Sequence, residues 1–159
     1  MTIGRRGLVL AALQVLLLLA VGARYRADRA RLPRVWARTV PFDPDTPLRG
    51  RYVSLALEVH VRGKPADGGV TLAVDGDRLV ALPSVKDSWL RLRPPDNAGR
   101  VALRDPIAFF IPEHVPDPSR RPAGEELWAE VSVPPRGMPR PLRLGVRRGS
   151  GAIELLDLP

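Results

Sequence analysis

Cysteine is absent from the 159-residue chain, and lysine occurs only at Lys64 and Lys86. Without cysteine the chain forms no disulfide, no thiolate metal site and no thiol nucleophile, although this absence does not identify a compartment. The sequence also lacks a glycine-rich phosphate loop that opens a helix and a serine in a nucleophile elbow. These absences exclude several common classes of enzyme, and they direct attention to where the charge and the apolar residues lie.

The net charge of +8 would by itself suggest a nucleic-acid partner. However, residues 1–39 hold eight of the 25 basic residues and one of the 17 acidic residues, so this segment carries +7 and residues 40–159 carry +1. Arginine beside an apolar segment meets anionic lipid headgroups, at about 1 kcal/mol per residue. The charge distribution therefore predicts a lipid bilayer as partner and no nucleic-acid-binding domain.

A continuous apolar run extends over residues 7–23, and Gln14 is its only strongly polar side chain. As a helix rising about 1.5 Å per residue the run spans roughly 26 Å, close to the roughly 30 Å of a bilayer's hydrocarbon layer. We predict a single transmembrane anchor here. It follows a short basic tail at residues 1–6 and precedes a basic juxtamembrane stem at 24–39 and a β-rich domain at 40–159.

Two properties of the anchor stay open at this level. Its basic start, apolar run and small residues at Gly22 and Ala23 also fit a cleavable secretory signal. Six arginines lie between Arg24 and Arg38, which by the positive-inside rule would keep the domain cytoplasmic, whereas the signal-like layout places it outside. We predict a retained, single-pass anchor with an extracytoplasmic domain.

The stem fits three descriptions: a short basic helix, an extended segment or an irregular linker, with Trp36 as an interfacial side chain. Three prolines, Pro41, Pro44 and Pro47, follow it. Because each lacks a backbone donor and restricts the residue before it, no continuous helix can pass through them. The folded domain is therefore predicted to start here.

Alternating apolar residues in the domain predict seven or eight short strands, of which Tyr52–Val61 is the clearest. Residues 70–74 and 78–83 flank an Asp-Gly-Asp turn and predict a β-hairpin. Further strands are predicted at 89–93, 100–103, 107–111 and 127–133, and a second hairpin at 142–147 and 152–158, although 125–130 could instead begin a short helix. Because no helical periods separate the strands, the predicted fold is mainly β: an N-terminal single transmembrane helix followed by a small antiparallel β-sandwich or partly open β-barrel.

The segment PFDPDTPLRGRYVSLAL, residues 41–57, resembles the signature region of the GDYXXLXY family, a group of uncharacterised membrane-anchored bacterial proteins. Gly50, Tyr52 and Leu55 match the family's motif. Arg51 stands where the motif has aspartate, and Leu57 where it has its final tyrosine. Glycine permits a backbone turn that other residues resist, and Tyr52 and Leu55 then project from opposite faces of a strand. These three residues have a structural or a ligand-binding role.

The FFIPE segment at 109–113 is similar to the aromatic, proline and acid segment of the same family, which extends the resemblance over most of the chain. The resemblance implies a retained anchor and a β-rich domain in the bacterial envelope, working beside a larger multi-span membrane protein. It supplies no catalytic residues.

Glu58, His60, Glu113 and His114 are the polar candidates, because two carboxylates and two imidazoles could hold zinc. Their spacing matches no metal motif. Glu58 and His60 lie two apart on one strand and so share a solvated face, where a cross-strand ion pair is the simpler expectation. We predict no catalytic residue, no metal site and no cofactor.

The leading hypothesis is a non-enzymatic accessory or interaction module in the envelope. One alternative is a membrane-associated hydrolase or metal-dependent enzyme that uses the four polar candidates. The other is a sensor that binds a small envelope ligand on the proline-rich loop at 112–126, where four prolines and a glycine argue against a regular element.

Overall fold

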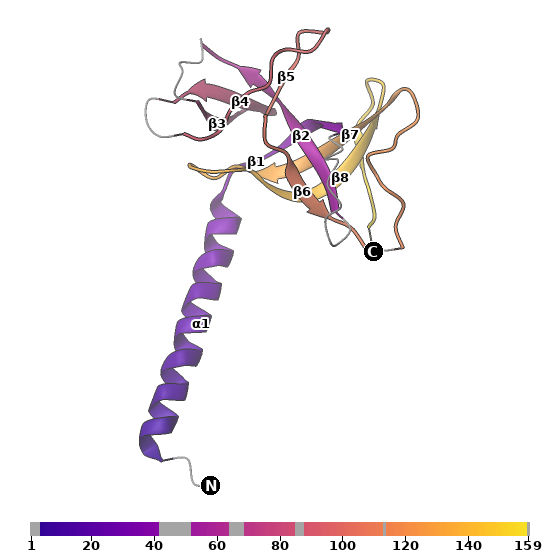
Figure 1. The fold of residues 1–159 in the computed structure, drawn as a ribbon. Coiled ribbons are helices and arrows are strands. Elements are labelled where there is room, and N and C mark those ends of the chain that lie inside the picture. The colour runs from indigo at the N-terminus through magenta and orange to yellow at the C-terminus, as the bar shows by residue number, and fades with distance from the viewer. Residues whose placement is uncertain (1–3, 42–51, 64–68, 85–87, 113, 159) are drawn as a thin grey trace. The chain divides into compact units, whose positions relative to one another are not determined.

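The computed structural model describes residues 4–41, 52–63, 69–84, 88–112 and 114–158. The chain divides into two units, with the boundary between Leu32 and Pro33. The first unit is a helix and the second is a β-domain (Figure 1).

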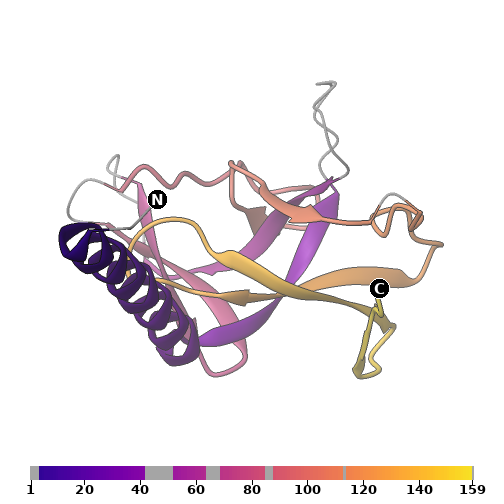
Figure 2. The ribbon, with the colours of Figure 1, turned by 90° about the horizontal axis from the view of Figure 1, so that it is seen from below.

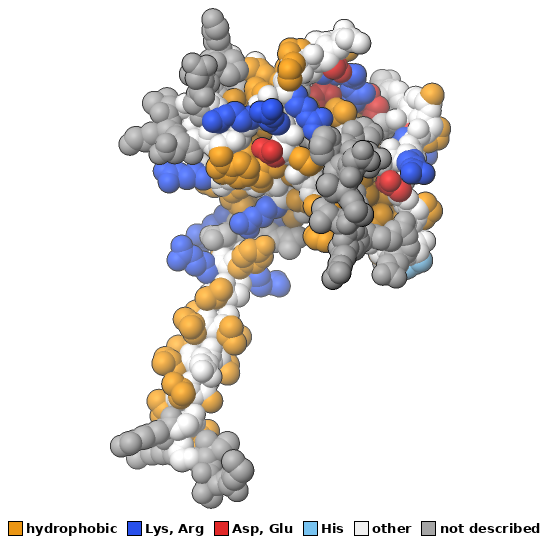
Figure 3. All heavy atoms as spheres, in the orientation of Figure 1, with side chains coloured by type: hydrophobic (Ala, Val, Ile, Leu, Met, Phe, Trp, Pro, Cys, Tyr) orange, Lys and Arg blue, Asp and Glu red, His pale blue; other side chains and the backbone are white. Residues whose placement is uncertain are grey.

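Helix α1 (Arg5–Arg31) is apolar on all sides along most of its length. Its stretch Gly7–Ala27, 21 residues, is long and apolar enough to cross a membrane, and none of it is buried by protein. Hydrophobic side chains cover the helix, and basic side chains gather toward its C-terminal end (Figure 3). The predicted apolar helix is confirmed, with a span four residues longer than expected. This length and composition fit a membrane anchor and a secretory signal alike.

The described part of the β-domain holds nine strands in one sheet. They are β1 (Arg34–Pro41), β2 (Tyr52–Val61), β3 (Val70–Asp75), β4 (Arg78–Pro83), β5 (Val101–Ala102), β6 (Ile107–Phe110), β7 (Glu125–Ser132), β8 (Arg140–Arg148) and β9 (Ile153–Leu155). Neighbouring strands follow the order β3-β4-β2-β1-β7-β8-β9, and β5 and β6 also pair with β2. Leu55 is paired with Pro41 on one side and Ile107 on the other, so β1 and β6 flank β2 on opposite edges.

The sheet is mixed and open. All its pairs are antiparallel except β2 with β4, which run in parallel, with His60 opposite Val80. The parallel pair arises because the second strand of the β3–β4 hairpin, rather than the first, lies beside β2. No pair joins β3 to β9 among the described strands, so the sheet does not close. The mainly β fold is confirmed, and the expectation of a wholly antiparallel sheet is wrong for this one pair. Figure 2 shows the bent sheet from below.

Strand β1 corrects the predicted stem at 24–39. Its residues Val35, Ala37 and Thr39 are buried, while Trp36 and Arg38 lie on the opposite face. The strand pairs with β7 over its first five residues and with β2 over its last three, so it lies inside the sheet. The domain therefore begins at Pro33 rather than at residue 40, and of the expected stem only residues 24–31 form a helix.

One hydrophobic core lies inside the bent sheet. Leu55, Leu57 and Leu103 are fully buried there, together with Leu144 of β8. The buried Thr39 hydroxyl has a partner: it donates a hydrogen bond to the Leu127 carbonyl, 2.9 Å away. Because a buried hydroxyl without a partner costs about 1–3 kcal/mol, this bond fixes how β1 and β7 pack.

The remaining strand predictions are largely confirmed. The hairpin turn between β3 and β4 is present, with Gly76 at a φ of 61°. Residues 125–132 form a strand rather than a helix, and β8 and β9 form the second hairpin. The strand predicted at 89–93 is wrong: only Leu92 is bridged there, to Leu103.

Candidate functional site

Side chains from three adjacent strands form a polar face on the side of the sheet opposite the core. The register places Arg38 opposite Trp128, and Trp128 opposite Gly145. Because alternate residues of a strand point to the same side, the neighbouring rows share this face. The polar face consists of Trp36, Arg38, Glu126, Trp128, Glu130, Arg143 and Arg147, and Glu58 and His60 of β2 border it.

A hollow of about 620 Å³ opens on this polar face, and we call it the β1 hollow. It is lined by Arg34–Arg38 of β1, Glu58 and His60 of β2, Gly76–Leu79 from the β3–β4 hairpin, and Trp128, Arg147 and Ile153. Two of the four polar candidates from the sequence thus share one hollow.

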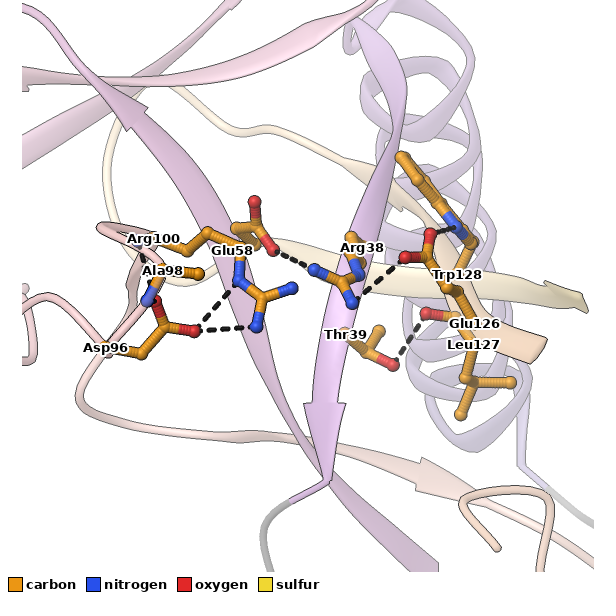
Figure 4. Close-up of polar contacts among 9 residues, drawn as sticks. All are labelled: Arg38, Thr39, Glu58, Asp96, Ala98, Arg100, Glu126, Leu127 and Trp128. Carbon is orange, nitrogen blue, oxygen red and sulfur yellow. Dashed lines mark hydrogen bonds and ion pairs between the residues drawn. The ribbon is translucent and has the colours of Figure 1, made fainter. Parts of the chain in front are cut away.

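Arg38 occupies the centre of an ion-pair network that joins three strands (Figure 4). Its Nη1 lies 3.2 Å from Oε2 of Glu58, and its Nη2 lies 3.0 Å from Oε1 of Glu126. The other oxygen of Glu126 accepts a hydrogen bond from Nε1 of Trp128, at 3.3 Å. The cross-strand ion pair expected for Glu58 is therefore present, and this carboxylate is engaged by arginine.

Arg147 forms the second feature of the hollow. Its guanidinium lies over the Trp128 ring, 4.2 Å from the ring centre. Its Nε is buried and has no hydrogen-bond partner in the described part of the chain. Arginine over tryptophan is a favourable cation–π arrangement that holds the side chain in place. The guanidinium is thus fixed by a ring and not by a carboxylate.

Gly145 leaves space for the side chains of Trp36 and Ile153. A Cβ at this position would lie 2.5 Å from Cγ2 of Ile153 and 3.2 Å from Cζ3 of Trp36. Because real Cβ atoms essentially never approach other atoms within 3.0 Å, any larger residue would push β9 or Trp36 aside. Glycine therefore lets Trp36 and Ile153 pack across β8.

Glu130 and Arg143 form a further pair on the polar face. Nε of Arg143 donates to Oε2 of Glu130 at 2.6 Å, and Glu130 is buried. This contact raises the pKa of Arg143, because the hydrogen bond and the charge of Glu130 both favour the protonated guanidinium. The pair compensates a carboxylate placed beneath the surface.

The structure does not bring the polar candidates His60 and His114 to a common hollow. His60 is exposed on the wall of the β1 hollow, whereas His114 is exposed in the loop at 112–126 and lines neither this hollow nor the two smaller ones of the domain. Glu113 and Gly50 lie outside the described residues. Within the described ranges no three His, Asp or Glu side chains gather closely enough to hold a metal ion.

The two segments that carry the family resemblance meet as paired strands. Tyr52 lies opposite Phe110, their ring centres 6.2 Å apart and the rings tilted by 59°. Leu55, three residues on, is fully buried in the core, so its role is structural. The Phe110 side chain is 76% exposed. We call Tyr52 and Phe110 the aromatic pair.

Two smaller hollows lie elsewhere in the domain. One, of about 410 Å³, is lined by Thr71, Leu72, Ser88–Leu90 and the 134–137 segment. The other, of about 420 Å³, lies between Pro106–Ala108 and the segment that enters β8. None of the three hollows is lined by the 112–126 loop, where the small-ligand site was predicted.

Sequence reasoning missed Trp36, Arg38, Trp128 and Arg147. Trp36 and Arg38 alternate with small apolar residues, which is a strand signal, but the basic context suggested a stem. Their partners come from far along the chain: the hydrogen bond that ties β1 to β7 spans 88 residues. Nothing local in the sequence shows that pairing.

Comparison of the chain with protein-family models, with curated proteins and with solved structures finds no significant match. The resemblance to the GDYXXLXY family therefore stays a prediction, and the function of the chain has to be inferred from its described residues.

Proposed function

We propose that the chain is a membrane-anchored accessory module that acts by binding and not by catalysis. In this proposal helix α1 stays in the bilayer and the β-domain lies on the extracytoplasmic side of the envelope, beside a larger multi-span membrane protein. The unburied, apolar surface of Gly7–Ala27 supports retention in lipid. The resemblance to the GDYXXLXY family supports the envelope setting.

The observation that carries the proposal is the aromatic pair. Phe110 exposes 76% of its side chain on β6, a strand that pairs only with β2 among the described strands. Large aromatic residues are enriched where partners bind, and an unpaired strand edge offers backbone groups to a second chain. Phe110, backed by Tyr52, is therefore a suitable anchor for a protein contact.

The placement of the polar candidates supports binding over catalysis. Glu58 is engaged by Arg38, which lowers its availability as a base or a metal ligand. His60 and His114 do not line a common hollow. A hydrolase would need a nucleophile and a base within hydrogen-bond reach.

Site-specific photo-crosslinking tests the contact at the aromatic pair. A benzophenone amino acid is placed at Phe110 of the full-length chain in intact cells, and at Asn97 in the exposed 94–100 turn as control. We expect an adduct with a membrane protein from position 110 and none from position 97. Equal adducts from both positions, or none from 110, would contradict the proposal.

A matched pair of variants extends this test. Phe110→Ser and Leu155→Ser each replace an exposed apolar residue on a strand. Only Phe110→Ser is expected to reduce co-purification, in mild detergent and without a crosslinker, of the partner that the crosslink identifies. The domain's thermal unfolding should change little in either variant, because both side chains lie mostly in solvent.

The location has its own test. Protease added to intact spheroplasts should digest the domain, and mass spectrometry of the mature chain should find its first residues still attached. A protected domain would place it on the cytoplasmic side, and an N-terminus beginning after Ala23 would show that the helix is a cleaved signal.

A further inference from the structure

We propose that the β1 hollow binds a phosphate-bearing anion, and that the headgroup of an anionic lipid is its natural source. This inference goes beyond the proposed protein contact, because it concerns a different surface from the aromatic pair. The two can fail separately: loss of lipid binding leaves the crosslink at Phe110 untouched, and the reverse also holds.

The charge of the lining favours an anion. Four arginines line the hollow, against two acidic residues: Arg34, Arg38, Arg78 and Arg147 face Glu58 and Asp77. A cation would meet this net positive lining at a cost, because like charges repel. The hollow is thus built for a negatively charged occupant.

The arginines of the lining divide into engaged and available groups. Arg38 is neutralised by its two glutamates, and Arg78 has Asp77 at 3.8 Å. Arg34 and Arg147 have no carboxylate within 4 Å in the described part of the chain. These two guanidinium groups remain for a ligand.

Arg147 has the geometry of an oxyanion receptor. The Trp128 ring covers one face of its guanidinium, which leaves the N–H groups free to donate in the plane. Nε is buried and has no acceptor among the described residues, and an unsatisfied buried donor costs free energy. Phosphate oxygens match the guanidinium fork in a bidentate arrangement, which an ammonium group cannot provide.

The size and walls of the hollow favour a headgroup over bare phosphate. At about 620 Å³ it exceeds the needs of a single inorganic ion, and Trp36 and Trp128 give it apolar walls. Tryptophan beside arginine is typical of the membrane–water interface. An amphiphilic anion with a glycerol or acyl portion would contact both kinds of wall.

The covalent chain also favours a lipid source. Only Leu32 and Pro33 separate the end of α1 at Arg31 from the start of β1 at Arg34. Three residue steps extend at most about 11 Å, so the first arginine of the lining stays close to the end of the helix. A helix held in a bilayer therefore delivers Arg34 to the region of the headgroups.

The test uses the full-length chain in uncharged maltoside micelles, with Trp89→Phe so that only Trp36 and Trp128 report. Short-chain phosphatidylglycerol, glycerol 3-phosphate and uncharged short-chain diacylglycerol are titrated separately, and tryptophan fluorescence is recorded. We expect a saturable change with phosphatidylglycerol. Arg147→Gln should weaken its apparent affinity about tenfold, which is the loss typical of one charge-assisted hydrogen bond.

Arg148→Gln is the matched control, because it removes the neighbouring arginine, which pairs with Glu125 and Glu154 and does not line the hollow. It should bind as the parent does. If Arg147→Gln lowers the melting temperature of the domain, Arg34→Gln provides a second test. A weakened affinity of Arg34→Gln for phosphatidylglycerol also supports the proposal.

Saturation by phosphatidylglycerol alone identifies a lipid headgroup site, and saturation by glycerol 3-phosphate as well identifies a phosphate site open to soluble ligands. Both results support phosphate recognition. No saturable change with either anion, an equal response to diacylglycerol, or equal binding by the parent and both hollow variants would overturn it.

Discussion

Helix α1 and the β-domain place the same kind of side chain in opposite surroundings. Leu18 of the helix exposes 72% of its side chain, whereas Leu55 of β2 exposes none. In the domain, leucine is removed from water by other strands. In the helix no described residue covers it, and the length and composition of the helix fit a membrane anchor or a secretory signal. Unfolding of the domain and the behaviour of the helix toward a membrane are therefore expected to respond to separate substitutions.

Leu55→Ala is expected to have the largest effect on unfolding of the domain while leaving the helix unaffected. Removing a fully buried leucine leaves a cavity and should lower the free energy of unfolding by about 2–5 kcal/mol. Denaturant titration of tryptophan fluorescence, on the full-length chain in uncharged detergent, measures it. Leu17→Ala in the helix is the control and should leave the domain's unfolding midpoint in place; an equal loss in both variants would refute the separation.

The converse change is Leu17→Arg. Arginine at the centre of a membrane helix costs about 3 kcal/mol relative to leucine, so the fraction of the chain that resists carbonate extraction should fall. The unfolding midpoint of the domain should stay unchanged, because no described residue of the domain buries this position. Full retention in the membrane fraction would speak against insertion of α1.

Two glycines, one in each unit, test the same independence with a smaller expected effect. Gly145→Val forces contacts with Ile153 and Trp36 and should lower the free energy of unfolding by about 1–3 kcal/mol, with a shift in Trp36 fluorescence. Gly22→Val in the helix meets no atom within 4 Å, so thermal unfolding of the domain should not respond to it. A similar shift in melting temperature for both would mean that the two units are coupled.

The smallest effect concerns acid stability of the domain surface. Nε of Arg148 donates to Glu125 at 2.8 Å, and this hydrogen bond holds the pKa of the Glu125 carboxyl below its usual value of 4.5. A lowered pKa gives stability that is fully present above pH 4.5 and is lost as the pH falls through the lowered value. The difference in melting temperature between the parent and Glu125→Gln should therefore shrink below pH 4.5.

Asp105→Asn is the control for this pH series. It replaces an exposed carboxylate that has no ion-pair partner in the described chain. Its melting temperature should follow the parent across the series. A gap for Glu125→Gln that widens in acid would reverse the assigned sign.

The fold was predictable where the pattern is local. The alternation of Tyr52–Val61 and the Asp-Gly-Asp turn identify β2 and the β3–β4 hairpin, because strand period and turn chemistry are read from adjacent residues. β1 was missed since two of its three inward residues, Ala37 and Thr39, are small or polar and mark an apolar face poorly. The parallel pairing of β4 with β2 could not be predicted, because the sequence pattern of a hairpin does not show which of its two strands will pair with β2.

In the candidate site, too, local patterns were predictable and long-range pairing was not. Glu58 and His60 were found because they alternate on one predicted strand. The assembly of Arg38 between Glu58 and Glu126 depends on pairing across both edges of β1, which no local pattern encodes. The arrangement of this face is thus a property of long-range register rather than of any single motif.

The inward position of β1 has a consequence for biogenesis. Synthesised early, this strand gains β2, the next strand along the chain, on one edge, but its other edge waits for β7, whose first residue is Glu125. Pairing over so long a separation is slow to form. A chain emerging from the ribosome or translocon thus keeps an open strand edge until most of it has been delivered. A chaperone that shields exposed strands would act during that interval.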